Sequence, residues 1–128
     1  MTEEILVKSL PIIANFMIYK GKPFCQNLRF KKTEIDPQTG KPVKVIYPLT
    51  GWTAKAEIRP SDNSPVLTAE MVVNVTEAEG MISLALTAEQ TAAIKPGMYY
   101  WDLRTEKPNE IPNYWMRGQF LVSGRVTE

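Results

Sequence analysis

The sequence contains no histidine and only one cysteine, Cys25. Without histidine the chain has no imidazole base for a catalytic triad and no histidine ligand for zinc. A single cysteine excludes an intrachain disulfide and argues against a small secreted scaffold held together by disulfides. No segment approaches the roughly 20 apolar residues of a membrane-spanning helix, and the first residues lack the pattern of a signal peptide. We therefore expect a soluble protein made in a cytoplasm.

Strong net charge is also lacking: the chain carries +1 over 128 residues. Such a chain has no global field that would attract nucleic acid or a membrane, so neither is expected as a partner. The charge is nevertheless uneven, because residues 1–64 have ten Lys or Arg and six Asp or Glu, whereas residues 65–128 have five and eight. The basic excess lies mainly in Lys20–Lys44. Its simplest interpretation is the solvated face of two strands; a contact surface for an acidic partner is the alternative.

Period-2 alternation of apolar and polar residues dominates the chain and is clearest in Trp52–Arg59. Alternation of this kind predicts a strand with one face in a core and the other in water. Similar patterns predict further strands in Ala14–Ile18, Phe24–Phe30, Val43–Tyr47, Leu67–Val75, Met81–Leu86, Met98–Leu103 and Tyr114–Ser123. Seven to eight strands with one short helical turn predict an all-β, immunoglobulin-like β-sandwich, formed as a single domain by residues 12–128.

Turn-forming residues separate the expected strands. Asp36–Gly40 predicts a hairpin turn, since Asp begins the turn, Pro presets φ and Gly supplies the positive φ that closes it. Ser61–Pro65 and Glu77–Gly80 predict two further turns, and Glu106–Asn113 is expected to be a polar loop.

One helical turn is expected between two strands, at Thr87–Ile94. Thr87 and Gln90 have the spacing of a capping box, and Pro96 and Gly97 end the turn. Such a turn must carry the chain from one sheet to the other. In immunoglobulin-type domains a tyrosine follows this corner and bonds back to its backbone. Tyr99 and Tyr100 are both candidates, and the alternation favours Tyr99 as the inward residue.

No group of residues predicts a catalytic, cofactor or metal site. The serines have no histidine to activate them, and Asp102 stands alone in a strand, which favours an outward or structural role. Asp36, Asp62 and Asn63 lack the ligand spacing of a calcium loop. We therefore expect a protein that is not an enzyme and that needs no cofactor.

The aromatic residues are the better candidates for function. Because neighbours in a strand alternate, at least one large side chain must face outward within Tyr99–Trp101 and again within Tyr114–Met116. Exposed aromatics on a small domain often mark protein contacts, so we name as contact candidates Tyr100, Trp101, Tyr114 and Trp115. Stacking on a sugar is the alternative. A nucleic-acid platform would need more interleaved cations than Arg104 and Arg117.

The N-terminal segment, residues 1–11, precedes the first expected sandwich strand. Its apolar residues Ile5, Leu6 and Val7 have no obvious partner strand. A free tail is one interpretation. The other is an arm that lies on a neighbouring subunit, which makes Ile5, Leu6 and Val7 further contact candidates.

Several motifs, in this order, resemble those of small β-sandwich virion proteins of tailed phages. They are Phe16–Phe30 as an opening hairpin, Leu49–Arg59, Ile82–Ile94 followed by Pro96-Gly97 and Tyr100–Leu103, and Gly118–Val122 as a last strand. The family is similar to the N-terminal domain of the upper baseplate protein of siphophages, an adaptor that docks receptor-binding proteins. Two departures are a longer hairpin at Thr33–Tyr47 and no extension beyond Glu128.

The resemblance implies a structural or adaptor protein located in the virion, in the tail or baseplate. It implies no catalytic residues, and as partners it implies other virion proteins and copies of the same chain. A capsid decoration protein is the nearest alternative. A carbohydrate-binding or cell-surface module is the alternative from another class.

Overall fold

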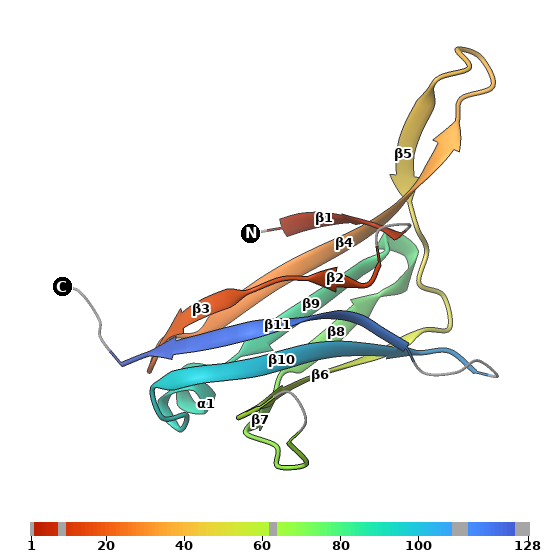
Figure 1. The fold of residues 1–128 in the computed structure, drawn as a ribbon. Helices are drawn as coiled ribbons and strands as arrows, with labels where there is room; N and C mark the ends of the chain where they lie inside the picture. The colour runs from red at the N-terminus through yellow and green to blue at the C-terminus, as the bar shows by residue number, and fades with distance from the viewer. Residues whose placement is uncertain (1, 8–9, 62–63, 109–112, 125–128) are drawn as a thin grey trace.

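Two β-sheets packed face to face make up the computed structural model, which describes residues 2–7, 10–61, 64–108 and 113–124 (Figure 1). The five-stranded sheet A contains β1 (Thr2–Leu6), β4 (Phe24–Ile35), β5 (Pro42–Ile46), β8 (Val72–Thr76) and β9 (Met81–Leu86). The six-stranded sheet B contains β2 (Ile12–Ile13), β3 (Phe16–Tyr19), β6 (Thr53–Arg59), β7 (Ala69–Glu70), β10 (Gly97–Glu106) and β11 (Asn113–Ser123). The predicted all-β sandwich is confirmed.

The strand order is immunoglobulin-like. In sheet A, β4, β9 and β8 lie side by side, and in sheet B the order is β11, β10, β6. The short helix α1 (Ala88–Ala92) joins β9 in one sheet to β10 in the other. At the opposite edge of sheet B, β2 and β3 pair in parallel with the last strand, β11. Antiparallel hairpins and sheet-crossing connections of this kind define the immunoglobulin class of sandwich.

The described residues form more strands than the seven to eight predicted. One reason is that the predicted strand Leu67–Val75 is divided at Met71: β7 pairs with β6 in sheet B, and β8 pairs with β9 in sheet A. Met71 is buried between them, and its amide donates to the carbonyl of Ala56. The apolar alternation continues through this switch because both sheets face the same core, so the sequence pattern carries no sign of it.

Two clusters of aromatic rings fill the core. In the first, the centroid of Trp101 lies 5.0 Å from that of Phe16, and Phe24 and Phe120 lie 5.5 Å apart. In the second, the Trp115 ring lies 5.0 Å from Phe30 and 5.2 Å from Trp52. The rings meet edge-on or tilted, the arrangements that aromatic quadrupoles prefer.

The corner between the sheets has the predicted capping box. The amide of Gln90 donates to the Thr87 hydroxyl at 3.1 Å, and the Thr87 amide donates to Gln90 Oε1 at 2.9 Å. Tyr99 closes the corner, since its hydroxyl donates a 2.6 Å hydrogen bond to the carbonyl of Lys95. The inward tyrosine is therefore Tyr99, as the alternation indicated.

Lys20 and Thr91 tie this corner to the turn after β3. Lys20 Nζ donates to the carbonyls of Ala92 at 2.6 Å and Ile94 at 3.1 Å, so its charge stabilises the end of α1. The fully buried Thr91 hydroxyl lies within hydrogen-bond distance of the Lys22 carbonyl and accepts from the Gly21 amide. One lysine of the basic segment thus has a role inside the fold.

The predicted hairpin turn at Asp36–Gly40 is present. The Gly40 amide donates to the Asp36 carbonyl at 2.7 Å, and Gly40 has a φ of +69°. The turn at Glu77–Gly80 is also present, as the 3-10 turn η2 (Glu77–Glu79). The predicted turn Ser61–Pro65 and loop Glu106–Asn113 include residues outside the described ranges. Within those ranges, no helix has the length and apolar character to span a membrane.

Candidate protein-contact surfaces

The outer face of sheet B carries the largest group of exposed large apolar side chains among the described residues. The strand register places Met98 of β10, Leu121 of β11 and Met17 of β3 side by side in one row across three strands. Directly paired residues on one face lie about 5 Å apart at Cβ, so these side chains form a continuous surface. Met17 is 55% exposed and Met98 is 46% exposed.

Tyr100 and Tyr114 lie on this same outer face. Tyr100 pairs with Gln119 in the row next to Met98, and Tyr114 pairs with Arg104 further along β10. Tyr114 is 52% exposed, whereas Tyr100 is partly buried. Ile13 and Tyr19 extend the surface along the β2–β3 edge. We call the face formed by Ile13, Met17, Tyr19, Met98, Tyr100, Tyr114 and Leu121 the outer face of sheet B.

Trp101 and Trp115 are not on a surface, so the prediction that they contact a partner is wrong. Trp101 is 2% exposed, because Tyr100 takes the outward position and the alternation turns Trp101 into the core. Trp115 is 5% exposed beside the equally buried Met116. A register shift between Leu103 and Arg104 explains this break in alternation, since a bulge lets two successive residues face the core.

The N-terminal segment lies on this chain's own sheet. β1 pairs in parallel with β4, Ile5 is opposite Phe30, and Ile5 is only 4% exposed. Ile5 therefore cannot reach a neighbour, and its prediction as a contact residue is wrong. Leu6 and Val7 are partly buried, and Val7 packs against the core. Neither a free tail nor an arm on another subunit describes residues 2–7; Met1, Lys8 and Ser9 lie outside the described residues.

Charged residues border the apolar row on the outer face of sheet B. Arg59 donates to Glu57 at 3.2 Å and lies 3.7 Å from a carboxylate oxygen of Asp102. Asp102 is partly buried on this face and therefore has the outward, structural role expected for it. These pairs leave the apolar row flanked by polar groups, the usual arrangement of a protein-contact surface.

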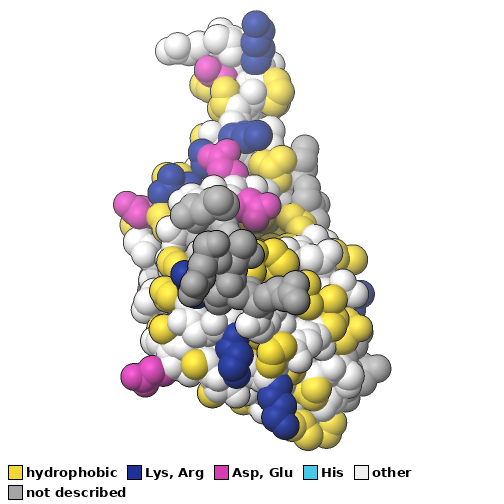
Figure 2. Space-filling model, turned by 90° about the vertical axis from the view of Figure 1, so that its left-hand side faces the viewer, with side chains coloured by type: hydrophobic (Ala, Val, Ile, Leu, Met, Phe, Trp, Pro, Cys, Tyr) yellow, Lys and Arg dark blue, Asp and Glu magenta, His cyan; other side chains and the backbone are white. Residues whose placement is uncertain are grey.

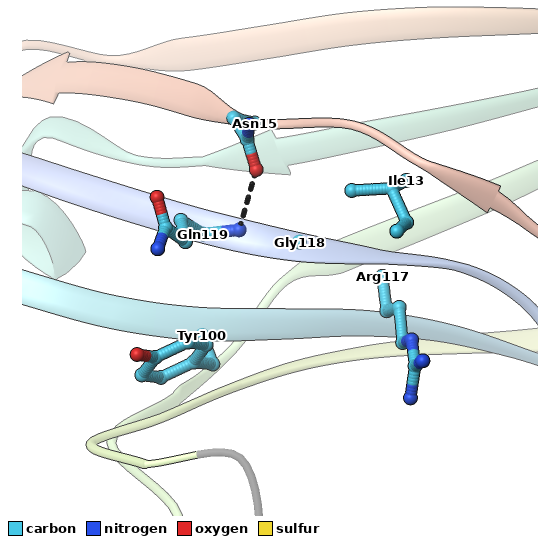
Figure 3. Close-up of a pocket in the computed structure, with 6 residues that line it drawn as sticks. All are labelled: Ile13, Asn15, Tyr100, Arg117, Gly118 and Gln119. Carbon is cyan, nitrogen blue, oxygen red and sulfur yellow. Dashed lines mark hydrogen bonds between the residues drawn. The ribbon is translucent and has the colours of Figure 1, made fainter.

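A hollow of about 360 Å³ opens on this face, lined by Ile13, Asn15, Tyr100, Arg117, Gly118 and Gln119 (Figure 3). Gly118 lies between Arg117 and Gln119 in this lining, and Asn15 Oδ1 accepts from the Gln119 amide at 2.9 Å. Figure 3 shows the Tyr100 ring on the left and the Arg117 side chain on the right, both extending over β10. The described residues contain no cluster of three or more His, Cys, Asp or Glu side chains.

The second exposed surface is the β4–β5 hairpin. β4 and β5 continue past the sandwich as a two-stranded ribbon, which we call the arm (residues 31–46) (Figure 1). Figure 2 shows the arm at the top, standing clear of the body with hydrophobic and cationic side chains on its surface. Ile35 is 64% exposed, Ile46 42% and Val43 39%. The long hairpin noticed in the sequence is this arm.

Sequence reasoning missed Met17, Met98 and the arm as exposed apolar surfaces. Met17 alternates with the inward residues Phe16 and Ile18, and Met98 precedes the inward Tyr99, so the same period-2 pattern could have identified both.

No family model matches the sequence, and no curated protein matches it. Similar solved structures include the Listeria monocytogenes internalin-like protein lmo2027, with a TM-score of 0.39 and 10% identity over 97% of this chain. This chain spans only 30% of that protein's length. A chain from a structure that describes T cell specificity and activation by the bacterial superantigen toxic shock syndrome toxin-1 has a TM-score of 0.39 and 10% identity, covering 86% of this chain and 92% of that one. Amebosin has a TM-score of 0.34 and 13% identity, covering 94% and 96%. Scores this low add nothing on function.

Proposed function

We propose that this chain is a non-catalytic structural or adaptor protein of a tailed-phage virion, placed in the tail or baseplate, that works through contacts with other virion proteins and with copies of itself. The virion assignment rests on the ordered sequence motifs that resemble phage β-sandwich proteins. The immunoglobulin-like sandwich is compatible with that resemblance.

The observation that carries the contact role is the outer face of sheet B. Met17, Leu121 and Met98 form one continuous apolar row there, with Tyr100 in the adjacent row. Arg59, Asp102 and Arg117 border this row and separate it from the exposed Tyr114. Removing contiguous apolar surface from water is favourable, so a surface of this kind favours the binding of a partner that covers it. The apolar row spreads across three strands beside the hollow, which suits a protein partner better than a small ligand, because small-molecule sites enclose most of their ligand.

The alternative function, sugar binding, has less support. Trp101 and Trp115, the residues first considered for stacking on a sugar ring, are both buried. A sugar would have to stack on Tyr100 or Tyr114 at the surface. A role in the tail or baseplate and a role in capsid decoration would differ in the partner that is bound. In both roles the outer face of sheet B would make the contact.

The proposal is tested on particles of the phage that encodes the chain. Purified virions are labelled with a gold-conjugated antibody against this chain and are viewed by electron microscopy. We expect gold on the tail or baseplate. Gold on the head would move the assignment to capsid decoration, and unlabelled particles would refute the virion role.

The contact surface is tested with charged variants of the same phage protein. Met17→Lys and Tyr114→Lys place a cation on the outer face of sheet B at positions already exposed, so the fold should tolerate both. We expect each to reduce incorporation into particles. The matched control is Glu89→Lys, an equally exposed position on α1. Equal incorporation of all three variants would exclude this face as the contact surface.

A further inference from the structure

Among the described residues, the rest of the chain supports the arm only at its base, where Lys31 pairs with Leu6 and contacts Glu4 and where Ile46 lies beside Gly80. Beyond Phe30 no residue of β4 or β5 is fully buried, and Ile35, Val43 and Ile46 are 64%, 39% and 42% exposed. An isolated two-stranded hairpin with exposed apolar side chains is at best marginally stable in water. A third strand added to its edge would stabilise it.

Besides the edge of β1, two strand edges in sheet A are open in the described residues, those of β5 and β8. β5 pairs only with β4, and in the described part of the chain β8 pairs only with β9. Natural edge strands usually carry charge or proline that prevents pairing with another chain. β5 carries both, with Pro42 at its start and Lys44 at its centre, and so would not pair with just any strand. β8 has neither in its sequence Val-Val-Asn-Val-Thr, and its Val72 is 46% exposed. It is therefore an unprotected edge.

Both open edges face the same way. Lys31 of β4 is paired with Leu6 of β1 on one side and with Ile46 of β5 on the other. β5 therefore lies on the side of β4 away from β1. The same holds for β9, since Arg29 is paired with Glu4 of β1 and with Met81 of β9. The outer edge of β5 thus points in the direction of the outer edge of β8.

The two edges also carry opposite charge. The arm contains four lysines and two acids, and Lys41 and Lys44 are exposed and outside the ion pairs that Lys31 and Lys32 make with Glu4 and Glu34. Around β8 the ionisable residues are acidic: Glu70 precedes it, and Glu77 and Glu79 follow it. An approaching arm would meet complementary charge, which favours encounter and fixes register.

We propose that the arm of one copy of this chain adds to the β8 edge of a second copy, so that two copies exchange arms in a closed two-fold dimer. A two-fold rotation perpendicular to sheet A turns one copy's β5 edge toward the other's β8 edge. The same rotation brings the second arm to the first β8. Both contacts are identical, as a two-fold interface requires, and main-chain hydrogen bonds supply the pairing.

Strand directions and faces are consistent with this arrangement. Within one copy, β5 is antiparallel to β8, because three antiparallel pairings separate them, so the rotation makes the paired β5 and β8 parallel. Asn74 faces outward with its partner Ser83, whose hydroxyl bonds Asn27, and Lys44 is paired with the outward Thr33. The rotation preserves this face, so Lys44 of one copy and Asn74 of the other project from the same side at the centres of the paired strands.

The dimer uses neither the outer face of sheet B nor a virion partner. It can therefore fail while the proposed function stands, and the reverse also holds. The first test is charge reversal at the centre of the pairing, with the dimer dissociation constant measured by analytical ultracentrifugation. Asn74→Lys faces Lys44, and Lys44→Glu removes the attraction to the acidic edge. Each should raise the dissociation constant by on the order of tenfold, because both sites of the dimer change.

The double variant Lys44→Glu with Asn74→Lys restores opposite charges and should recover the wild-type dissociation constant. Asn74→Glu, beside Lys44, should not weaken the dimer. The control is Met98→Lys on the outer face of sheet B, which should leave the dissociation constant unchanged. Failure of the double variant to recover dimerisation would overturn the proposal. So would dissociation by Met98→Lys alone, because the contact would then use sheet B.

The second test is a disulfide that only two copies can form. In a Cys25→Ser background, Lys44→Cys and Asn74→Cys are made as two separate proteins, mixed and oxidised. Since each protein has one thiol, a heterodimer of the two must join β5 of one copy to β8 of the other. Glu89→Cys mixed with Lys44→Cys is the matched control. A monomeric chain, or no more of the Lys44–Asn74 product than of the control product, would refute the arm exchange.

Discussion

The indole nitrogen of Trp101 donates a 2.8 Å hydrogen bond to the carbonyl oxygen of Ala14. This bond joins β10, at the centre of sheet B, to the connection between β2 and β3 at its edge. Gly118 of β11 lies opposite Trp101 in the register, and a Cβ at that position would collide with the same Ala14 carbonyl. The backbone of the edge strands thus approaches β11 more closely than any side chain there would allow.

Gly118→Ala should therefore displace the Ala14 backbone and weaken its bond to Trp101. We expect a loss of about 1–3 kcal/mol in the free energy of unfolding, as for other overpacked sites. Urea denaturation measures the loss, and hydrogen exchange should locate it at the amides of β3. Arg117→Ala, an exposed neighbour, is the control and should change stability by less than about 0.5 kcal/mol. Equal stability of the two variants would show that the backbone can move away at no cost.

Tyr99→Phe removes the hydroxyl that closes the corner between the sheets. The hydrogen bond to the Lys95 carbonyl is 2.6 Å long, and a typical net contribution is about 0.5–1.5 kcal/mol. We expect a loss in that range in urea denaturation. Tyr100→Phe is a closely matched control, because it removes the same atom from the adjacent, outward-facing residue. The assignment of Tyr99 would be contradicted if Tyr100→Phe were the more destabilising change.

Thr91→Val replaces the buried hydroxyl that links α1 to the turn after β3. The change is nearly isosteric, but it leaves the amide of Gly21 without its side-chain acceptor. An unsatisfied buried polar group costs about 1–3 kcal/mol, and because this contact is only partly buried we expect a loss at the lower end of that range in thermal or urea unfolding. The control is Thr76→Val on the exposed side of β8, where little change is expected. A neutral Thr91→Val would mean that water replaces the hydroxyl.

Low pH should destabilise the pairing of β1 with β4. Lys31 Nζ lies 2.7 Å from Glu4, and its hydrogen bond and positive charge hold the pKa of the Glu4 carboxyl below its ordinary value. Because the folded-state pKa is the lower one, the pair stabilises the fold above the unfolded-state pKa. That contribution is lost as pH falls through the folded-state pKa. Hydrogen exchange of the β1 amides should therefore accelerate in acid relative to those of β9.

Glu4→Gln should abolish this pH dependence, and high salt should reduce it, since the pair is exposed to solvent. Glu3→Gln removes an equal charge from the same strand without touching Lys31, and should leave the pH dependence in place. An acid response that survives in Glu4→Gln would assign it to other carboxylates.

Local patterns predicted the fold well where neighbours in sequence decide it. The capping box at Thr87 and the turn at Asp36 depend on residues a few positions apart, and both are present as expected. Alternation likewise oriented Tyr99 correctly.

The sequence could not predict features that depend on distant partners. The pairing of β1 with β4 joins residues about 25 positions apart, and nothing in Thr2–Leu6 specifies that edge. The bulge beside Trp115 is set by the register with β10, so strict alternation misplaced that side chain. The exposed row on sheet B likewise exists only because the register brings Met17, Leu121 and Met98 together.

The position of β1 has a consequence for shorter versions of this chain. Its glutamates Glu3 and Glu4 border one side of sheet A, and Ile5 covers Phe30. A protein cut before Ile12 would lack β1. The backbone edge of β4 that pairs with β1 would then be exposed, without the acidic residues of β1 beside it. Removal of residues 1–11 would thus leave an unpaired strand edge, which favours aggregation.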